Sequence, residues 1–121
     1  EGAGAGCIQL GDGGNVIKTN PAYLEHMDWE GGVIDAPYTS ADMPALLEDL
    51  ESNASWLEEV RQRNVSNCLL RHDHLNRWDM VLKAAGLDAT PTAAARRIRL
   101  KEQAATLTTA PTRILSRSQN R

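Results

Sequence analysis

The chain has 121 residues, of which 41% are hydrophobic, 4% are aromatic and none is Phe. This length and composition predict one small domain with an aliphatic core, and no run of 18 apolar residues offers a transmembrane helix. The two cysteines, Cys7 and Cys68, are too few for a disulfide framework. Free, buried thiols in a reducing, cytoplasmic compartment are therefore predicted, with a single disulfide as the alternative.

Charge is distributed unevenly along the chain. Residues 1–90 carry 15 acidic and 6 basic side chains (net −9), whereas residues 91–121 carry 1 acidic and 7 basic ones (net +6), which together give the net charge of −3. A basic tail can indicate contact with nucleic acid or a membrane. This tail has no aromatic side chain to stack on bases and its charges are scattered. We therefore predict that it packs on an acidic surface, of this chain or of a partner, and that it does not bind nucleic acid.

Two short apolar segments near the N-terminus have the character of buried strands. Residues 7–10 lie between glycines, and residues 33–36 follow Gly31-Gly32 and end at Pro37. The 22 residues between them, 11–32, leave room for a crossover with a short helix that begins near Pro21. The two strands are therefore predicted to be parallel.

Two four-residue strands do not make a stable sheet by themselves. Parallel strands also require cover on both faces. We therefore expect further strands, contributed either by residues before Glu1 or by another chain.

Helices are predicted for most of the chain after residue 40. Apolar residues at positions 43, 46, 47 and 50 follow helical spacing, with Thr39 or Ser40 as the cap and a break at Ser52-Asn53. The next helix is predicted over residues 54–70. Its buried stripe is expected to contain Leu57, Val60, either Asn64 or Val65, and Cys68.

Two further helices complete the prediction. Asp73 caps a helix whose apolar stripe runs to Ala85 and which ends at Gly86. A Thr-Pro-Thr break at 90–92 separates it from a basic helix over residues 93–107, and residues 108–121 form a flexible basic tail. The predicted core comprises Leu46, Leu50, Leu57, Val60, Leu75, Trp78 and Leu82. The fold class is therefore α/β, with short parallel strands and a predominantly helical C-terminal half.

No motif in the sequence identifies a metal site or a catalytic pair. Cys68 and His72 share a helical face, but His72 and His74 point to opposite sides, so we interpret these histidines as flanking a helix junction. The carboxylates Asp28, Glu30 and Asp35 near the strand ends could act as general acids or bases, but no spacing among them selects a pair.

The small residues at the N-terminus differ from a dinucleotide-binding loop. In that motif the glycines follow a strand, whereas Gly2, Gly4 and Gly6 precede one. The alternating Ala3 and Ala5 suggest instead the end of a helix pressed close to a sheet.

Three stretches together resemble a known family. They are residues 1–6 (EGAGAG) before CIQL, residues 38–43 (YTSADM) with the leucines that follow, and residues 71–78 (RHDHLNRW) with AGL at 85–87. In this order they resemble the C-terminal end of a GT-B fold glycosyltransferase of the broad group 1 class, which transfers sugars from nucleotide donors. The resemblance covers residues 1–107 and implies part of a Rossmann-like donor-binding domain.

The resemblance also implies roles for individual residues. Glu1 matches the second of the family's two glutamates eight positions apart, which usually contacts the ribose of the donor nucleotide. Gly4 and Gly6 lie in the segment whose small residues let the backbone approach the diphosphate. The expected partners are a nucleotide-sugar donor and the remainder of the enzyme, with no cofactor, no metal and no catalytic residue assigned to this chain.

A second interpretation belongs to another functional class. The chain could be a small, non-catalytic helical module that binds a partner through its strand edges or basic tail. In either case, self-association through residues 7–10 or 33–36 is possible, because an unpaired strand edge invites pairing with another chain.

Overall fold

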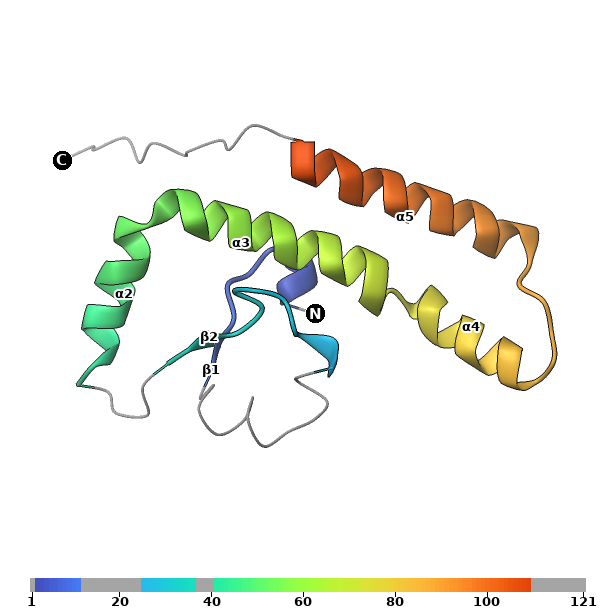
Figure 1. Ribbon diagram of the computed structural model, residues 1–121, viewed down its shortest axis with the longest axis horizontal. Helices are drawn as coiled ribbons and strands as arrows, with labels where there is room; N and C mark the ends of the chain where they lie inside the picture. Colours follow the sequence, from blue (N-terminus) through green and yellow to red (C-terminus); the bar gives the residue numbers. More distant parts are fainter. Residues whose placement is uncertain (1, 12–24, 37–40, 110–121) are drawn as a thin grey trace.

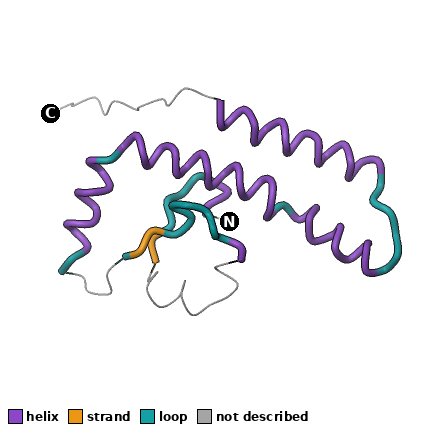
Figure 2. The backbone as a smooth tube through the Cα atoms, viewed as in Figure 1, coloured by secondary structure: helices purple, strands orange, loops and turns teal. Residues whose placement is uncertain are grey.

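The computed structural model describes residues 2–11, 25–36 and 41–109, which form a mostly helical structure with one small parallel sheet. The elements, in chain order, are the 3-10 turn η1 (Ala3–Ala5), β1 (Leu10–Gly11), β2 (Ile34–Asp35), α2 (Met43–Ser52), α3 (Ala54–Asn67), the π-helical turn η3 (Cys68–His72), α4 (His74–Ala84) and α5 (Pro91–Thr109). α2 and α4 lie at opposite ends of the long axis, and α5 runs back beside α3 (Figures 1 and 2).

The predicted parallel pairing of the strands is confirmed. Leu10 lies opposite Ile34, and the N–H of Ile34 donates to the carbonyl of Gln9 at 2.8 Å. The predicted strand lengths, 7–10 and 33–36, were too long, since each strand has two residues. Cys7 begins the first predicted strand, but its backbone N–H donates to the Gly2 carbonyl at 3.0 Å. This N–H is therefore not available for pairing with β2.

The helix boundaries agree closely with the predicted breaks. α2 and α3 separate at Asn53, the Asp73 carboxylate accepts the N–H of Leu75 at 3.0 Å as a cap, and Gly86 has the left-handed φ of +69° that ends a helix. Thr39 or Ser40 was predicted to cap α2, and this was wrong, because Asp42 occupies the N-cap position. Thr39 and Ser40 lie outside the described residues.

The long helix predicted over residues 54–70 changes character before its end. α3 ends at Asn67, and the chain continues through the wider π turn of η3 to His72. A π turn accommodates one more residue than an α turn and therefore rotates the following side chains. Here it brings Arg71 and His72 onto the segment that contains residues 25–28.

The last helix begins earlier and ends later than predicted. α5 spans Pro91–Thr109 rather than residues 93–107, and the hydroxyl of Thr90 accepts the N–H of Ala93 at 3.3 Å at its start. Residues 110–121, most of the predicted tail, lie outside the described residues, as does most of the predicted crossover helix. Among the described residues, no helix combines the length and apolarity needed to cross a membrane.

The core lies along α3. Val60 and Asn64 are fully buried, and Ala3, Leu50, Leu100 and Ala104 are each less than a tenth exposed. This confirms the predicted burial of Leu50 and Val60, whereas Leu46, Leu57, Leu75 and Leu82 are half-buried.

Trp78 is 63% exposed, so its predicted burial was wrong. α4 meets the rest of the described structure mainly through η3, so much of its apolar stripe has no neighbour to cover it.

Candidate functional site

The glycine-rich segment forms a turn closed by its own hydrogen bonds. The N–H groups of Ala5 and Cys7 both donate to the Gly2 carbonyl, and the N–H of Gly6 donates to the Ala3 carbonyl, each at 3.0 Å. Gly6 ends η1 with a φ of +79°, a conformation that favours glycine. Three N–H groups of the turn are therefore engaged within it.

The small residues of this turn allow a close approach to α3 and η3. A Cβ at Gly4 would stand 3.5 Å from the Cβ of Cys68, and the Nε of Arg61 donates to the Gly6 carbonyl at 3.0 Å. The small residues were predicted to end a helix that lies against a sheet. They form instead the 3-10 turn η1, and η1 packs against helix α3.

The structure places two of the three predicted donor-binding residues. Gly4 and Gly6 lie in the η1 turn immediately before the strand segment, whereas Glu1 lies outside the described residues. Their assigned contacts with a ribose and a diphosphate stay predictions.

Asn64 connects three parts of the chain from a fully buried position. Its Oδ1 accepts a hydrogen bond from the Nε1 of Trp29 at 2.8 Å, and its Nδ2 donates to the Cys7 carbonyl at 3.1 Å. One amide of α3 therefore fixes both the segment entering β1 and the segment leading to β2.

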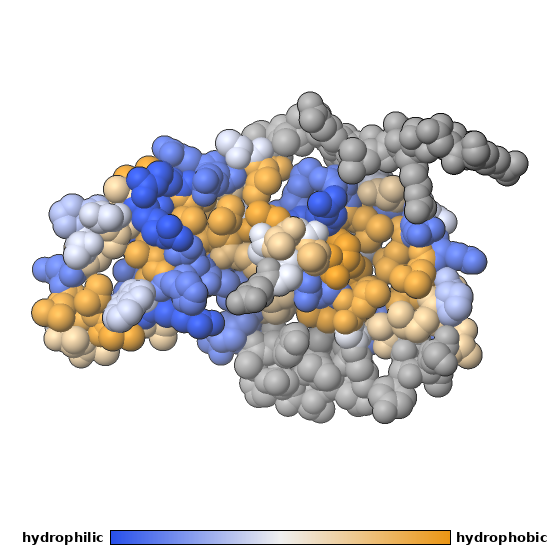
Figure 3. Space-filling model, turned by 180° about the vertical axis from the view of Figure 1, so that it is seen from behind, coloured by the Kyte–Doolittle hydropathy of each residue, from blue (hydrophilic) through white to orange (hydrophobic). Residues whose placement is uncertain are grey.

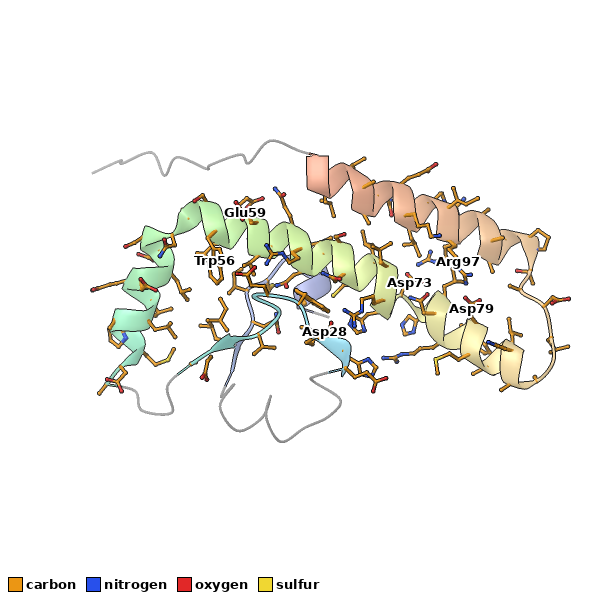
Figure 4. All side chains as sticks on the ribbon, in the orientation of Figure 1. Asp28, Trp56, Glu59, Asp73, Asp79 and Arg97 are labelled. Carbon is orange, nitrogen blue, oxygen red and sulfur yellow. The ribbon has the colours of Figure 1, made fainter. Side chains whose placement is uncertain are left out.

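A second set of contacts joins η3 to the same segment, which contains Asp28 (labelled in Figure 4). Arg71 donates from Nη1 to the Oδ1 of Asp28 at 2.5 Å and from Nη2 to the Glu25 carbonyl at 2.8 Å, with its guanidinium 5.4 Å from the ring centre of Trp29. The hydrogen bond from Arg71 lowers the pKa of Asp28. Arg71 thus combines an ion pair with a cation–π contact.

His72 extends this cluster. Its Nε2 lies 2.7 Å from the carbonyl oxygen of His26, so this nitrogen carries the proton and donates. The His72 ring centre is 5.9 Å from that of His26 and 6.0 Å from that of Trp29.

The structure does not bring the candidate metal ligands Cys68, His72 and His74 together around one point. His72 uses Nε2 on a backbone carbonyl, Cys68 faces Gly4, and His74 starts the next helix. No three potential ligands gather anywhere in the described ranges. Both thiols are free, but Cys7 is exposed, so its predicted burial was wrong. Partial burial raises the pKa of the Cys68 thiol, which favours its neutral form.

Two of the three carboxylates near the strand ends, Asp28 and Glu30, are ion-pair partners of arginines. Asp28 pairs with Arg71, and Glu30 pairs with Arg63 at 3.1 Å. Arg63 also donates to the backbone carbonyl of Glu30 at 2.8 Å. Both arginines therefore hold residues 25–30 against α3 and η3.

Charged contacts also fix α5 near the junction of η3 and α4. The Nη2 of Arg96 lies 2.6 Å from Oδ2 of Asp73, and Arg97 pairs with Asp79 (Figure 4). A hollow of about 260 Å³ lies beside them. Its lining is Leu69, Leu70, Leu75, Asn76, Asp79, Arg97, Leu100 and Lys101.

Sequence reasoning left the role of Asn64 undecided and missed the contacts of Trp29 and Arg71. Asn64 falls on the stripe that contains Leu57 and Val60, and a polar amide on an apolar stripe is a signal for a buried hydrogen-bond hub. The contact between Trp29 and Arg71 joins residues far apart in the chain, and no local pattern indicates it.

No protein-family model, no curated protein and no solved structure matches the chain.

Proposed function

We propose that this chain is the C-terminal portion of the donor-binding domain of a GT-B fold nucleotide-sugar glycosyltransferase. In this proposal its glycine turn, with Glu1, Gly4 and Gly6, contributes to the donor nucleotide site. The acceptor and the donor sugar are not assigned.

One observation carries the proposal: the turn, the parallel strand pair and the helices follow one another in the order that the resemblance implies. The small-residue turn precedes β1, a crossover leads to β2 in parallel register, and α2 follows. Such a parallel pair fits within a larger Rossmann-like sheet, because parallel sheets are normally covered on both faces.

The outer edge of β1 agrees with this placement. In a parallel ladder alternate residues face alternate edges, and Gln9 and Gly11 provide the carbonyls that β2 uses. The backbone groups of Ile8 and Leu10 therefore face the other edge, where no strand lies among the described residues. This edge suits a neighbouring strand supplied by the remainder of the enzyme.

Binding of nucleoside diphosphates tests the proposal without requiring catalysis. Labelled 1–121 chain is titrated with UDP, GDP and ADP at millimolar concentration, and amide shifts of residues 2–7 are followed by NMR. We expect saturable shifts with one diphosphate, weaker shifts with its parent nucleoside, and weaker binding by Glu1→Gln.

Glu59→Gln is the matched control, because Glu59 is an exposed glutamate of α3. It should bind like the unaltered chain. If no diphosphate shifts the turn, or if Glu1→Gln binds equally well, the donor-site proposal fails.

A non-catalytic helical interaction module is the alternative function. Two observations favour it: the turn uses its own N–H groups internally, and α4 exposes much of its apolar stripe. Hydrogen exchange separates the two proposals. Strongly protected amides on both strands in a compact monomer, without nucleotide binding, would favour the module.

A further inference from the structure

The charges of this chain are separated more sharply than its net charge suggests. Residues 19–60 contain 10 acidic and no basic side chains, whereas residues 61–121 contain 12 basic and 4 acidic ones. Most of the acidic stretch precedes α3, and most of the basic stretch follows it. The sequence therefore carries two complementary charged halves.

The fold places representatives of these halves at opposite ends of the molecule (Figure 1). α2 forms one end, where Glu48, Asp49 and Glu51 are exposed and belong to none of the ion pairs found in the described structure. Leu47, on the same helix, is 46% exposed. This end offers an apolar side chain among carboxylates.

α4 forms the other end and has the complementary character. Trp78 is 63% exposed and Val81 is 55% exposed, one helical turn apart. Arg77 is exposed beside Val81, and Lys83 is exposed on another side of the same helix; neither forms an ion pair among the described residues. From behind, apolar surface is visible among polar groups at this end (Figure 3). A contiguous exposed apolar surface with a charged rim is typical of an interaction site.

We propose that the chain associates head to tail, with α2 of one copy seated on the exposed face of α4 of the next. We take a second copy of the chain as the partner of the α4 face, because the chain itself carries a helix of opposite charge. The α4 face is apolar and basic, and α2 is apolar and acidic. Since the two surfaces differ, each copy keeps one free end, and association is open rather than closed.

Symmetric pairings are less favourable for an electrostatic reason. Two α4 faces would bring Arg77 against its own counterpart, and two α2 helices would bring Glu48 and Glu51 against theirs. Like charges across an interface disfavour association. The head-to-tail arrangement pairs opposite signs and covers Trp78 at the same time.

Sedimentation of charge-reversed variants tests the arrangement. In low salt, the weight-average mass of the unaltered chain should rise with concentration, and the rise should shrink in high salt because ions screen exposed charges. Glu48→Lys/Glu51→Lys should be monomeric, since both of its ends are then basic. Arg77→Glu/Lys83→Glu should be monomeric, since both of its ends are then acidic.

Mixing these two variants provides the decisive measurement. In the mixture, opposite charges face each other at both kinds of contact, because the reversed α2 of one variant also matches the reversed α4 of the other. The mixture should therefore recover the association that each variant alone has lost, with a mass that again rises with concentration. Trp78→Ala should weaken association of the unaltered chain at least tenfold. Glu102→Lys, an exposed reversal on α5, is the control and should associate normally.

Circular dichroism establishes that each variant keeps its helices. The proposal is overturned if the unaltered chain stays monomeric at millimolar concentration in low salt, or if the mixed variants do not form a complex. It is also overturned if Trp78 inserts into vesicles of anionic lipid while the chain does not self-associate, because the α4 face would then serve a membrane surface.

Discussion

At the scale of single residues, Asn64 links two distant parts of the chain to α3. It is fully buried, and its amide serves Trp29 on one side and the Cys7 carbonyl on the other. A buried polar group is tolerated when its hydrogen bonds are satisfied, and removing one partner leaves the others unpaired. Asn64 therefore couples the packing of α3 to the positions of both strand segments.

Replacing Asn64 tests this coupling. Asn64→Ala should lower the free energy of unfolding by about 1–3 kcal/mol, because two partly buried groups lose their hydrogen-bond partner. Urea denaturation measures the change. Asn67→Ala is the control, since the amide of Asn67 donates to the Arg63 carbonyl one turn earlier on the same helix. Equal losses in the two variants would contradict the proposed hub.

Asp73 links stability to pH. The hydrogen bond from Arg96 lowers its pKa, so the carboxylate stabilises the fold above its unfolded pKa of about 3.9, and this contribution is lost as pH falls through the lower folded value. Arg96 is 53% exposed, so solvent screening limits the contribution to less than about 1 kcal/mol.

Asp73→Asn separates this ion pair from the helix cap. Asparagine can still accept the N–H of Leu75 but cannot pair with Arg96. The variant should lose less than about 1 kcal/mol at pH 7 and should show a flatter loss of stability below about pH 4. Thermal unfolding across this range checks both expectations. Asp88→Asn, in the exposed loop before α5, should retain the pH dependence of the unaltered chain.

At the scale of elements, the segment leading to β2 packs against α3 through a glycine. Gly31 has a φ of +74°, and a Cβ there would stand 2.5 Å from Cγ2 of Val60. Two separate constraints, a left-handed backbone and a close approach, therefore act at one position. Gly86, with a φ of +69° and nothing within 4 Å, has the first constraint without the second.

These two glycines allow the constraints to be separated. Gly86→Ala should cost about 1 kcal/mol, the cost of a left-handed alanine. Gly31→Ala should cost clearly more, since Val60 must also move. Urea unfolding of both variants measures the difference, and similar losses would show that Val60 yields freely.

The contrast between α2 and α4 provides a second test at this scale. Leu50 is 7% exposed and Trp78 is 63% exposed. Leu50→Ala should therefore cost about 2–5 kcal/mol, whereas Trp78→Ala in the dilute monomer should change stability by less than about 0.5 kcal/mol. Chemical denaturation at low protein concentration checks both values. A large loss for Trp78→Ala would indicate that α4 is more fully packed than its exposure implies.

At the scale of the whole molecule, the proposed function predicts that this chain alone does not turn over substrate. A GT-B active site lies in the cleft between two domains, and the proposal assigns this chain to part of one of them. Purified 1–121 chain should release no nucleotide from nucleotide-sugar donors above the rate without protein. Turnover that disappears in Glu1→Ala would show instead that the chain carries a complete active site.

Local sequence patterns were sufficient to predict most of the elements. The spacing of leucines in α2, the cap at Asp73, the break at Asn53 and the glycine at 86 each involve neighbours within a few residues. Such interactions have the same geometry whatever the chain packs against, so they can be recognised in one dimension. The parallel strand pair was also predictable, because the length of a connection limits how it can return.

The tertiary structure decided what those patterns leave open: the register of the strands, the π turn at η3, the burial of Asn64 and the contact between Trp29 and Arg71. These features join residues distant in the chain, and their free energy depends on the surface that each element meets. Trp78 shows the same dependence, since an apolar stripe predicts which face of a helix favours burial, whereas only the neighbouring elements determine whether it is covered.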